Sequence, residues 1–331
     1  MVPSRQTVSV ATLQLSPVIP APHSLAVDHL GNLYVSDWMY NTVLKVSPDG
    51  QVSVFAGVPG QQGSEDGPGK LARFFYPTGV AVDLGGNIFV ADMSNHVIRK
   101  ITPEGVVTTL AGAAGQVGHT DGQGSQARFH CPRGVAVDAS GLVYVADTWN
   151  DVIRTISPDG MVATVAGVPG IQSRAAGPDG ESRFYRPCGI GLDEHGNIFV
   201  ADTYNHTIRK VSRQGVISTL AGLAASDQNG YPIGGVADGQ GADARFQRPS
   251  GVAVDHAGHV YVADTGNNIL RRITPDGLVS TVAGLAGKAG KASGSGEEAR
   301  FDAPVGLTID LRGHIFVADS KNCSIRQVTV S

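Results

Sequence analysis

The chain has 331 residues, a formal net charge of −4 and only 16% charged residues. It contains no basic stripe and no run of five like charges, which excludes the electrostatic footprint of a nucleic-acid-binding protein. Its apolar runs fall well short of the ~18 residues of a membrane span, and residues 1–6 lack the apolar core of a signal peptide.

The cysteines of the chain are Cys131, Cys188 and Cys323, and they do not form the paired framework that is typical of a secreted protein. A reducing compartment agrees with this pattern. Together these features predict a cytoplasmic protein with neither a membrane nor a nucleic acid as its partner, provided that no leader has been removed from the chain.

One sequence unit is repeated six times along the chain. Its landmark is the Asp that ends a Val-Ala-Asp or Val-Ser-Asp tripeptide, found at Asp37, Asp92, Asp147, Asp202, Asp264 and Asp319. The steps between these positions are 55, 55, 55, 62 and 55 residues. A fixed period of this length indicates a repeat architecture, either radial or linear.

Each unit contains four short runs rich in Val, Ile, Phe and Thr, separated by turn sequences such as Gly86-Asn87 and Pro103-Glu104-Gly105. This pattern predicts a four-stranded antiparallel blade. Six blades that can bury their faces only against one another close into a propeller. We therefore predict an all-β, six-bladed β-propeller that forms one domain over residues 1–331, with blades that start near residues 22, 77, 132, 187, 249 and 304.

The two ends of the chain predict how the ring closes. The sixth unit stops at Ser331, where its third strand ends, and Val8-Ser9-Val10 copies the fourth-strand sequence Val52-Ser53-Val54. Residues 1–13 are therefore predicted to supply the closing strand of the sixth blade and to pair with residues 325–328. Such closure leaves no free sheet edge.

Five of the segments that connect blades are long, with a step of 20 or 27 positions from the Gly that ends a fourth strand to the Pro that opens the next blade. The segment before the first blade, residues 13–22, is short. We expect the long bridges to form a wall around the channel mouth, with a gap beside His23. Each long bridge ends in an Arg-Phe pair, in which Phe is expected to plug the gap between blades and Arg to hold the loop. These pairs are Arg73-Phe74, Arg128-Phe129, Arg183-Phe184, Arg245-Phe246 and Arg300-Phe301.

A second Arg follows the landmark Asp by seven residues in five of the units, as in Asp92 and Arg99. A partly buried charge needs an opposite partner, so each pair is expected to meet across the second and third strands. The first unit has Leu44 in place of the Arg. Asp37 is therefore expected to be either solvated or available for another role.

The units that run from Gly79-Val80-Ala81-Val82-Asp83 to Asn95-His96-Val97-Ile98-Arg99-Lys100-Ile101 resemble the NHL repeat, and this resemblance covers essentially the whole chain. It implies a six-bladed NHL β-propeller whose top face is formed by the bridges and by the loops between second and third strands. It implies little about function, because the family includes protein-binding, RNA-binding and catalytic members.

Candidate site residues lie where the six units differ. One such position is the residue after the opening Pro, whose side chain points into the channel in propellers that this chain resembles. From the first to the sixth unit this residue is His23, Thr78, Arg133, Cys188, Ser250 and Val305. The second residue after the landmark Asp, on the top face, is Met39, Ser94, Trp149, Tyr204, Gly266 or Lys321. Trp38, Tyr40, Thr78, Trp149, Ser250 and Lys321 are accordingly our candidate ligand-binding residues.

Three kinds of catalysis are candidates at this site. Pro22-His23-Ser24-Leu25 resembles a motif of peptidyl-hydroxyglycine amidating lyases, but the alternate blades supply Arg133 and Ser250 where zinc would need histidines. Calcium is a candidate because Asn side chains lie near the axis, although no carboxylate occupies the ring. The third is a hydrolase of esters, lactones or phosphotriesters, with Cys188 as nucleophile, His23 as base, and Arg133 and Tyr204 stabilising negative charge.

Two functional classes therefore stay open. One is a small-molecule hydrolase that acts on an anionic or phosphoryl-like ligand, which Arg133 favours. The other is a non-catalytic binding propeller that uses the same face for a peptide or protein. If it binds a protein, the surface formed by Trp38, Met39, Tyr40, Trp149 and Tyr204 should be an exposed apolar patch and not the wall of a pocket.

Overall fold

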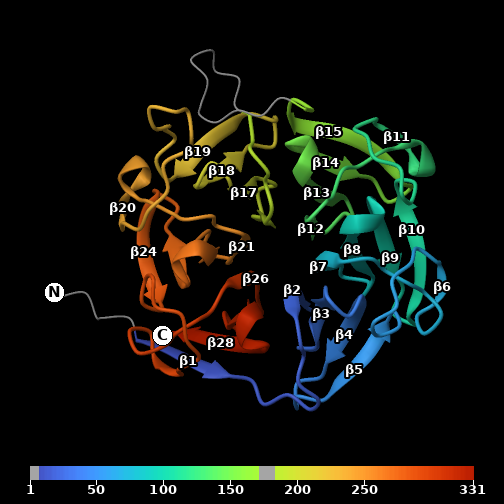
Figure 1. Ribbon diagram of the computed structural model, residues 1–331, viewed down its shortest axis with the longest axis horizontal. Helices are drawn as coiled ribbons and strands as arrows, with labels where there is room; N and C mark the ends of the chain where they lie inside the picture. The colour runs from blue at the N-terminus through green and yellow to red at the C-terminus, as the bar shows by residue number, and fades with distance from the viewer. Residues whose placement is uncertain (1–6, 171–182) are drawn as a thin grey trace.

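The computed structural model describes residues 7–170 and 183–331, which form six antiparallel sheets arranged around a central axis (Figure 1). The prediction of a six-bladed β-propeller is confirmed. Helical structure is confined to short 3₁₀ turns in these residues. None of the helices in the described ranges has the length and apolar character that a bilayer span requires.

The strands of each blade run from the channel outward. Blade 1 contains β2 (Pro22–Val27), β3 (Leu33–Asp37), β4 (Thr42–Val46) and β5 (Val52–Ala56). Blade 2 contains β7 (Pro77–Val82), β8 (Ile88–Asp92), β9 (Val97–Ile101), β10 (Val106–Ala111) and β6 (Gly67–Pro68). Blade 3 contains β12 (Gly134–Val137), β13 (Val143–Asp147), β14 (Val152–Ile156), β15 (Met161–Gly167) and β11 (Gly122–Gln123).

The other three blades repeat this plan. Blade 4 contains β16 (Ile190–Leu192), β17 (Ile198–Asp202), β18 (Thr207–Val211) and β19 (Ile217–Ala221). Blade 5 contains β21 (Gly251–Val254), β22 (Val260–Asp264), β23 (Ile269–Ile273), β24 (Leu278–Ala283) and β20 (Gly239–Gln240). Blade 6 contains β26 (Pro304–Ile309), β27 (Ile315–Asp319), β28 (Ser324–Val330), β1 (Val8–Thr12) and β25 (Gly294–Ser295).

Short 3₁₀ turns follow the second strand or interrupt the bridges. The turns after the second strands are η1 (Met93–Asn95), η3 (Thr148–Asn150), η5 (Thr265–Asn267) and η6 (Ser320–Asn322), and those in the bridges are η2 (Gly124–Gln126) and η4 (Gly241–Asp243).

The N-terminal strand closes the ring, as the sequence predicts. β1 pairs antiparallel with β28, with Val8 opposite Val330 and Val10 opposite Val328. Backbone hydrogen bonds extend the ladder, because the Thr7 and Ser331 amides each donate to the carbonyl of the other residue. Val10 is buried in an apolar cluster with Val328 and Phe301, so β1 contributes to the core as well as covering an edge.

The long bridges add strands to the outer edges of blades, which the sequence analysis did not predict. β6, for example, pairs with β10, and β11 pairs with β15. Figure 1 shows β6, β11 and β20 at the periphery of the disc. These bridges run along the outer edges of the blades before they turn back to the axis. The wall around the channel mouth, with its gap beside His23, stays a prediction.

A buried arginine holds each long bridge that the structure describes completely. In blade 2, Arg99 forms an ion pair with Asp92 (2.8 Å) and a second with Asp66 of the bridge (2.7 Å). Its guanidinium also lies 5.1 Å from the ring centroid of Phe74, which is fully buried. Asp66 in turn accepts a hydrogen bond from the Thr109 amide, where the outer strand has a bulge. The predicted Asp–Arg pairing is confirmed.

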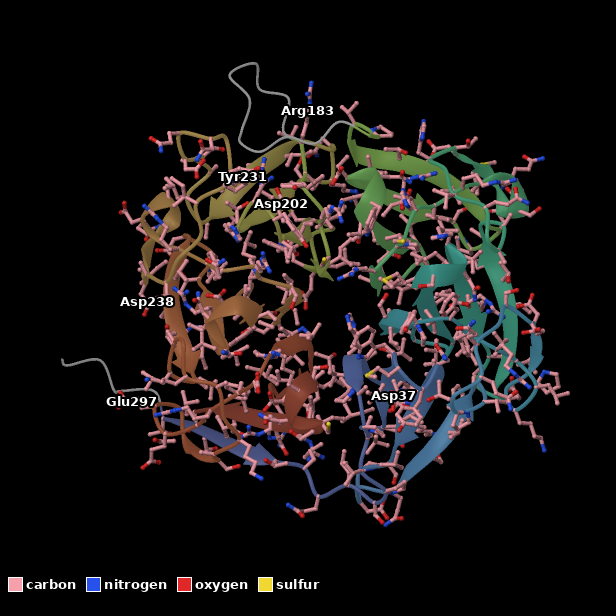
Figure 2. The ribbon with its side chains drawn as sticks, in the orientation of Figure 1. Asp37, Arg183, Asp202, Tyr231, Asp238 and Glu297 are labelled. Atoms are coloured by element: carbon pink, nitrogen blue, oxygen red, sulfur yellow. The ribbon has the colours of Figure 1, made fainter. Side chains whose placement is uncertain are left out.

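The same arrangement recurs around the ring with small changes. Ion pairs of 3.0–3.5 Å join Asp147 to Arg154, Asp202 to Arg209, Asp264 to Arg271 and Asp319 to Arg326. Figure 2 shows Asp202 in the inner part of its blade and Asp238, the bridge partner of Arg271, at the outer rim. One side chain therefore ties the inner half of a blade to the bridge on its outer half.

Blade 1 lacks a long bridge and also lacks the charged arrangement. Leu44 occupies the Arg position and Ile19 occupies the Phe position, and both belong to one apolar cluster. Asp37 is 1% exposed, which excludes the first of the two expected alternatives, a solvated carboxylate. It accepts a hydrogen bond from the Tyr40 amide, and burial raises the pKa of its carboxyl.

Deletion of residues 1–12 should strongly destabilise the protein. The deletion removes β1, exposes the edge of β28 and uncovers the apolar cluster around Val328. We expect the melting temperature to fall by more than 10 °C, measured by circular dichroism, together with concentration-dependent aggregation. A truncated protein that melts at the wild-type temperature would contradict the closure.

Arg99→Leu should cost about 3–5 kcal/mol in the free energy of unfolding, because it leaves Asp92 buried without its cation and releases Asp66. Urea denaturation measures this loss. The double variant Asp92→Asn/Arg99→Leu removes the stranded charge and should recover part of the stability. Equal stability of Arg99→Leu and wild type would show that the pair does not hold the bridge.

Candidate ligand site on the top face

The functional candidates gather on one face of the disc, where the bridges return to the axis and meet the 3₁₀ turns. The Trp149 amide, for instance, donates to the His130 carbonyl at the end of a bridge. We define this side as the top face. The innermost strands start here, so the residues that follow the opening prolines surround the top of the channel.

Glycines allow the innermost strands to approach one another. A Cβ atom on Gly134 would lie 2.0 Å from the Cys188 carbonyl oxygen, and one on Gly189 would lie 2.0 Å from that of Ser250. Real Cβ atoms do not approach backbone so closely, so only glycine fits at these positions. The ring is consequently narrow, and its side chains face a small space.

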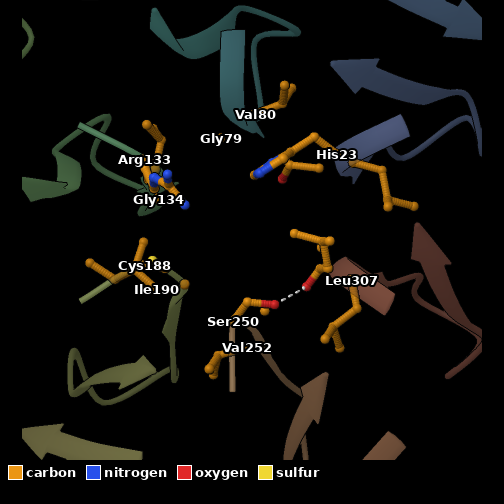
Figure 3. Close-up of a pocket in the computed structure, with 17 residues that line it drawn as sticks. His23, Gly79, Val80, Arg133, Gly134, Cys188, Ile190, Ser250, Val252 and Leu307 are labelled. Atoms are coloured by element: carbon orange, nitrogen blue, oxygen red, sulfur yellow. Dashed lines mark hydrogen bonds between the residues drawn. The ribbon is translucent and has the colours of Figure 1, made fainter. Parts of the chain in front are cut away.

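A cavity of about 90 Å³ lies at the top of the channel (Figure 3). Its lining includes His23, Arg133, Cys188, Ser250 and Val305. Below them lies a ring of buried aliphatic side chains, formed by Leu25, Val80, Val135, Ile190, Val252 and Leu307. Drug-sized ligands occupy pockets of about 300–1,000 Å³. This cavity is therefore sized for a few waters or for one small functional group.

Arg133 supplies the positive charge in the cavity. Within the described residues no ion pair or hydrogen bond involves its guanidinium, and its Nε atom is buried without a partner. Figure 3 shows Arg133 and His23 directed toward each other across the cavity. Burial and the charge of Arg133 lower the pKa of His23 to about 3, although a hydrogen bond with the Thr78 backbone opposes this shift. The His23 ring is therefore neutral at physiological pH.

The predicted nucleophile and base are not in contact. His23 and Cys188 come from blades 1 and 4 and lie on opposite sides of the cavity (Figure 3). The Cys188 thiol donates to the Arg186 carbonyl oxygen (3.6 Å), and the His23 Nδ1 has no partner in residues 7–170 and 183–331. A histidine with a pKa of about 3 is also a weak base. Hydrolysis by this pair stays a prediction.

Three other candidates have structural contacts. Thr78 is 1% exposed, and its hydroxyl lies 3.2 Å from the Arg133 carbonyl oxygen, so it joins two blades and does not line the cavity. Ser250 lines the cavity, but its hydroxyl is shared between Thr265 Oγ1 and the Val305 carbonyl. Lys321 lies outside the cavity, 3.9 Å from Asp302, with a solvent-exposed side chain.

Tyr204 and Trp149 lie outside the cavity and form part of an exposed surface. The guanidinium of Arg186 lies 3.8 Å from the Trp149 ring centroid and 5.6 Å from that of Tyr204. The guanidinium of Arg248 lies 5.7 Å from the Tyr204 ring centroid. His130 adds to the series, 5.2 Å from Trp149. We call these five residues the aromatic–arginine band; it runs over blades 3 to 5.

A second group of aromatic side chains lies over blades 1 and 2. Trp38 contacts Tyr76, with ring centroids 5.5 Å apart, and lies 6.1 Å from His23. Met39 and Tyr40 beside it are 60% and 45% exposed, and Trp149 and Tyr204 are 43% and 37% exposed. None of these side chains lines the cavity, and they form two groups on the top face in which Trp38 is half-buried. Protein binding at this face stays a prediction.

Calcium does not fit this cavity. Its lining contains no carboxylate side chain, and Arg133 would repel a cation. In the described part of the chain, no group of three or more His, Cys, Asp or Glu side chains has an arrangement suited to a metal ion. The cavity instead has the charge of an anion site.

The structure also explains the Asn-His position of the repeat as a latch between blades. In blades 2 to 6, the residue just before the opening proline adopts a positive φ, as in Tyr76 (51°) and Arg186 (50°). Each of their amides donates to a side chain of the preceding blade. The acceptors are Asn41 for Tyr76, His96 for Cys131, Asp151 for Arg186, His206 for Arg248 and Asn268 for Ala303. The sequence analysis did not predict this contact with the next blade.

Comparison with known proteins agrees with the fold. A family model for the NHL repeat matches residues 184–211 and 246–272, and a model for the teneurin NHL domain matches residues 117–179. NHL repeat-containing protein 2 of Bos taurus is 30% identical over 92% of this chain and 46% of its own length. Protein SUPPRESSOR OF QUENCHING 1, chloroplastic, of Arabidopsis thaliana is 31% identical over 94% of this chain and 30% of its own length.

A solved structure shares the architecture at lower identity. An auxiliary nutrient binding protein from Bacteroides thetaiotaomicron superposes with a TM-score of 0.70 and 15% identity over 98% of this chain and 77% of its own. The closed ring of four-stranded blades, with a latch between neighbours, defines a six-bladed β-propeller. This chain belongs to the NHL-repeat family. It spans less than half the length of the two curated relatives named above.

The double variant His96→Asn/His206→Asn should be less sensitive to acid than wild type. Burial lowers the pKa of both histidines below the usual 6.5, so the unfolded chain binds more protons as the pH falls through 6.5, and stability is lost. Asn does not titrate, and Asn41 and Asn268 already make the same hydrogen bond. We expect the drop in melting temperature between pH 7 and pH 5 to be roughly 1–3 °C smaller than in wild type.

The solvent-exposed His119 provides the control for this comparison. His119→Asn should leave the pH dependence of the melting temperature unchanged. If the double variant loses as much stability on acidification as wild type, the neutral latch is not what responds to pH.

Proposed function

We propose that the chain is a binding propeller whose top face docks an extended segment of a peptide or protein. The observation that carries this proposal is the aromatic–arginine band, which lies outside the cavity. Its members Trp149, Tyr204 and Arg248 are exposed, and Arg186 and His130 are half-buried. Such surfaces supply most of the energy of protein interfaces, since Trp, Tyr and Arg dominate binding hot spots. A cavity of about 90 Å³ alone would hold only a small part of any ligand.

The charge of the band favours an acidic partner. Neither Arg186 nor Arg248 forms an ion pair with a carboxylate in the described residues, although the buried Asp151 lies near Arg186. Their guanidinium groups are stacked on aromatic rings, which leaves the edges of the groups free to receive carboxylates in a bidentate manner. Asp or Glu side chains of the partner would meet these edges, and its apolar side chains would cover Trp149 and Tyr204.

The small-molecule hydrolase is the second candidate function. The observation in its favour is that one cavity contains Arg133, His23 and Cys188. Catalysis would require a substrate that bridges His23 and Cys188, because no direct contact joins them. An anionic or phosphoryl-like ligand is the substrate class that Arg133 would bind.

Selection from a displayed library of peptides with free C-termini tests the binding proposal. We expect enrichment of acidic, apolar sequences. Trp149→Ala should weaken their binding by at least 30-fold, as fluorescence anisotropy would measure, because a hot-spot aromatic contributes about 2 kcal/mol or more. Leu84→Ala, which truncates a 79% exposed side chain in the turn at the other end of the innermost strand of blade 2, is the matched control and should not change the affinity.

Two outcomes would overturn the proposal. One is peptide binding that is unchanged in both Trp149→Ala and Tyr204→Ala. The other is turnover of an activated ester, lactone or phosphotriester that is lost in Cys188→Ala and in His23→Ala, with the fold intact, which would make the hydrolase the better account.

A further inference from the structure

We propose that Arg133 binds a single carboxylate in the channel-mouth cavity, and that in the docked complex this group is the C-terminal carboxylate of the partner segment. The first half of the inference rests on the cavity alone. The second half, the source of the carboxylate, rests on the proposed function.

The cavity contains one positive charge that the described residues do not neutralise. Arg133 lines the space, none of the ion pairs within the described ranges involves it, and its Nε is buried without a hydrogen-bond partner. Two of the fully buried arginines of the blades, Arg99 and Arg154, each meet two aspartates. Arg133 is half-buried, and withdrawing a cation from water without compensation is costly. An anion that enters the cavity would remove this cost.

The remaining lining favours a carboxylate over a phosphate. His23 is neutral, because burial and Arg133 hold its pKa near 3, so the cavity offers one positive charge and not two. The hydroxyl group of Ser250, which lines the cavity, already bonds to Thr265 and to the Val305 carbonyl. One guanidinium matches one planar, singly charged carboxylate in a bidentate manner, whereas a phosphate ester carries up to two charges and three acceptor oxygens.

The shape of the cavity favours a chain end. The space is about 90 Å³, and the ring of six aliphatic side chains from Leu25 to Leu307 closes it below. A continuous chain cannot pass through, but a terminal residue can place its carboxylate beside Arg133 and a small apolar side chain on the aliphatic floor. The aromatic–arginine band lies on the same face, where the preceding residues of the segment would run.

Four small probes test the chemistry by NMR of the Gly134 and Gly189 amides, both of which line the cavity. Acetate represents a free acid, N-acetylglycine a chain end, N-acetylglycinamide the same end without its charge, and inorganic phosphate the competing anion. We expect saturable shifts with acetate and N-acetylglycine and at least 10-fold weaker binding of the amide and of phosphate. Arg133→Gln should weaken acetate binding at least 10-fold, and Arg312→Gln, in an exposed turn, should not.

The melting temperature of Arg133→Gln shows whether the variant folds; if it does not, Arg133→Lys, which keeps the charge but not the bidentate geometry, replaces it. Unchanged acetate binding in the folded variant, or preference for phosphate, overturns the carboxylate site.

A selected peptide with a free C-terminus should bind at least 10-fold more tightly than its C-terminal amide. Equal binding of the two peptides overturns the chain-end assignment but leaves the docking proposal standing. Loss of docking with intact, Arg133-dependent acetate binding removes the docking proposal and the chain-end source, and leaves the cavity site.

Discussion

The buried arginine in each of blades 2 to 6 is the contact on which the rest of the ring depends. Its charge must be neutralised inside the protein, and in blade 2 the two carboxylates that neutralise it come from the second strand and from the bridge. Because these two parts are 26 residues apart in sequence, as Asp66 and Asp92 show, a local requirement for charge balance fixes a long-range arrangement. The bridge then returns to the axis at a defined point, which places the ring of channel-facing residues.

The fold could be predicted from the sequence because each blade repeats the same chemistry. The landmark Asp, the Arg seven residues later and the turn glycines are local signals, and their repetition specifies the closed ring. The fourth-strand copy at Val8 to Val10 even predicted which blade is completed by the N-terminus. The outer strands such as β6 were missed, because two residues, Gly67 and Pro68, give no strand signal in sequence. Their pairing depends on the position of the bridge, which only the arginine contacts determine.

The candidate site was predicted only in part. Aligning the six units correctly brought His23, Arg133, Cys188 and Ser250 to one cavity. It did not show that Thr78 would turn into the interface between blades, or that Tyr204 would lie beside two arginines on the surface. The alignment of the repeats shows which residues occupy equivalent positions in the six blades. It does not show how each side chain is oriented, because the orientation depends on packing against neighbouring blades, which differs from one blade to the next. Arg186 and Arg248 were missed because the position before the opening proline looked like a loop.

The latch between blades has a consequence for recognition. Arg186 and Arg248 sit at positive φ, with their amides held by Asp151 and His206 of the neighbouring blades. Their backbones are therefore fixed before any partner arrives, and the stacked rings restrict their side chains as well. Ordering flexible side chains is one of the main entropic costs of association. A surface whose side chains are already ordered by folding can bind a short segment through few contacts. Its affinity then depends on the stability of the contacts between blades as well as on the residues that touch the ligand.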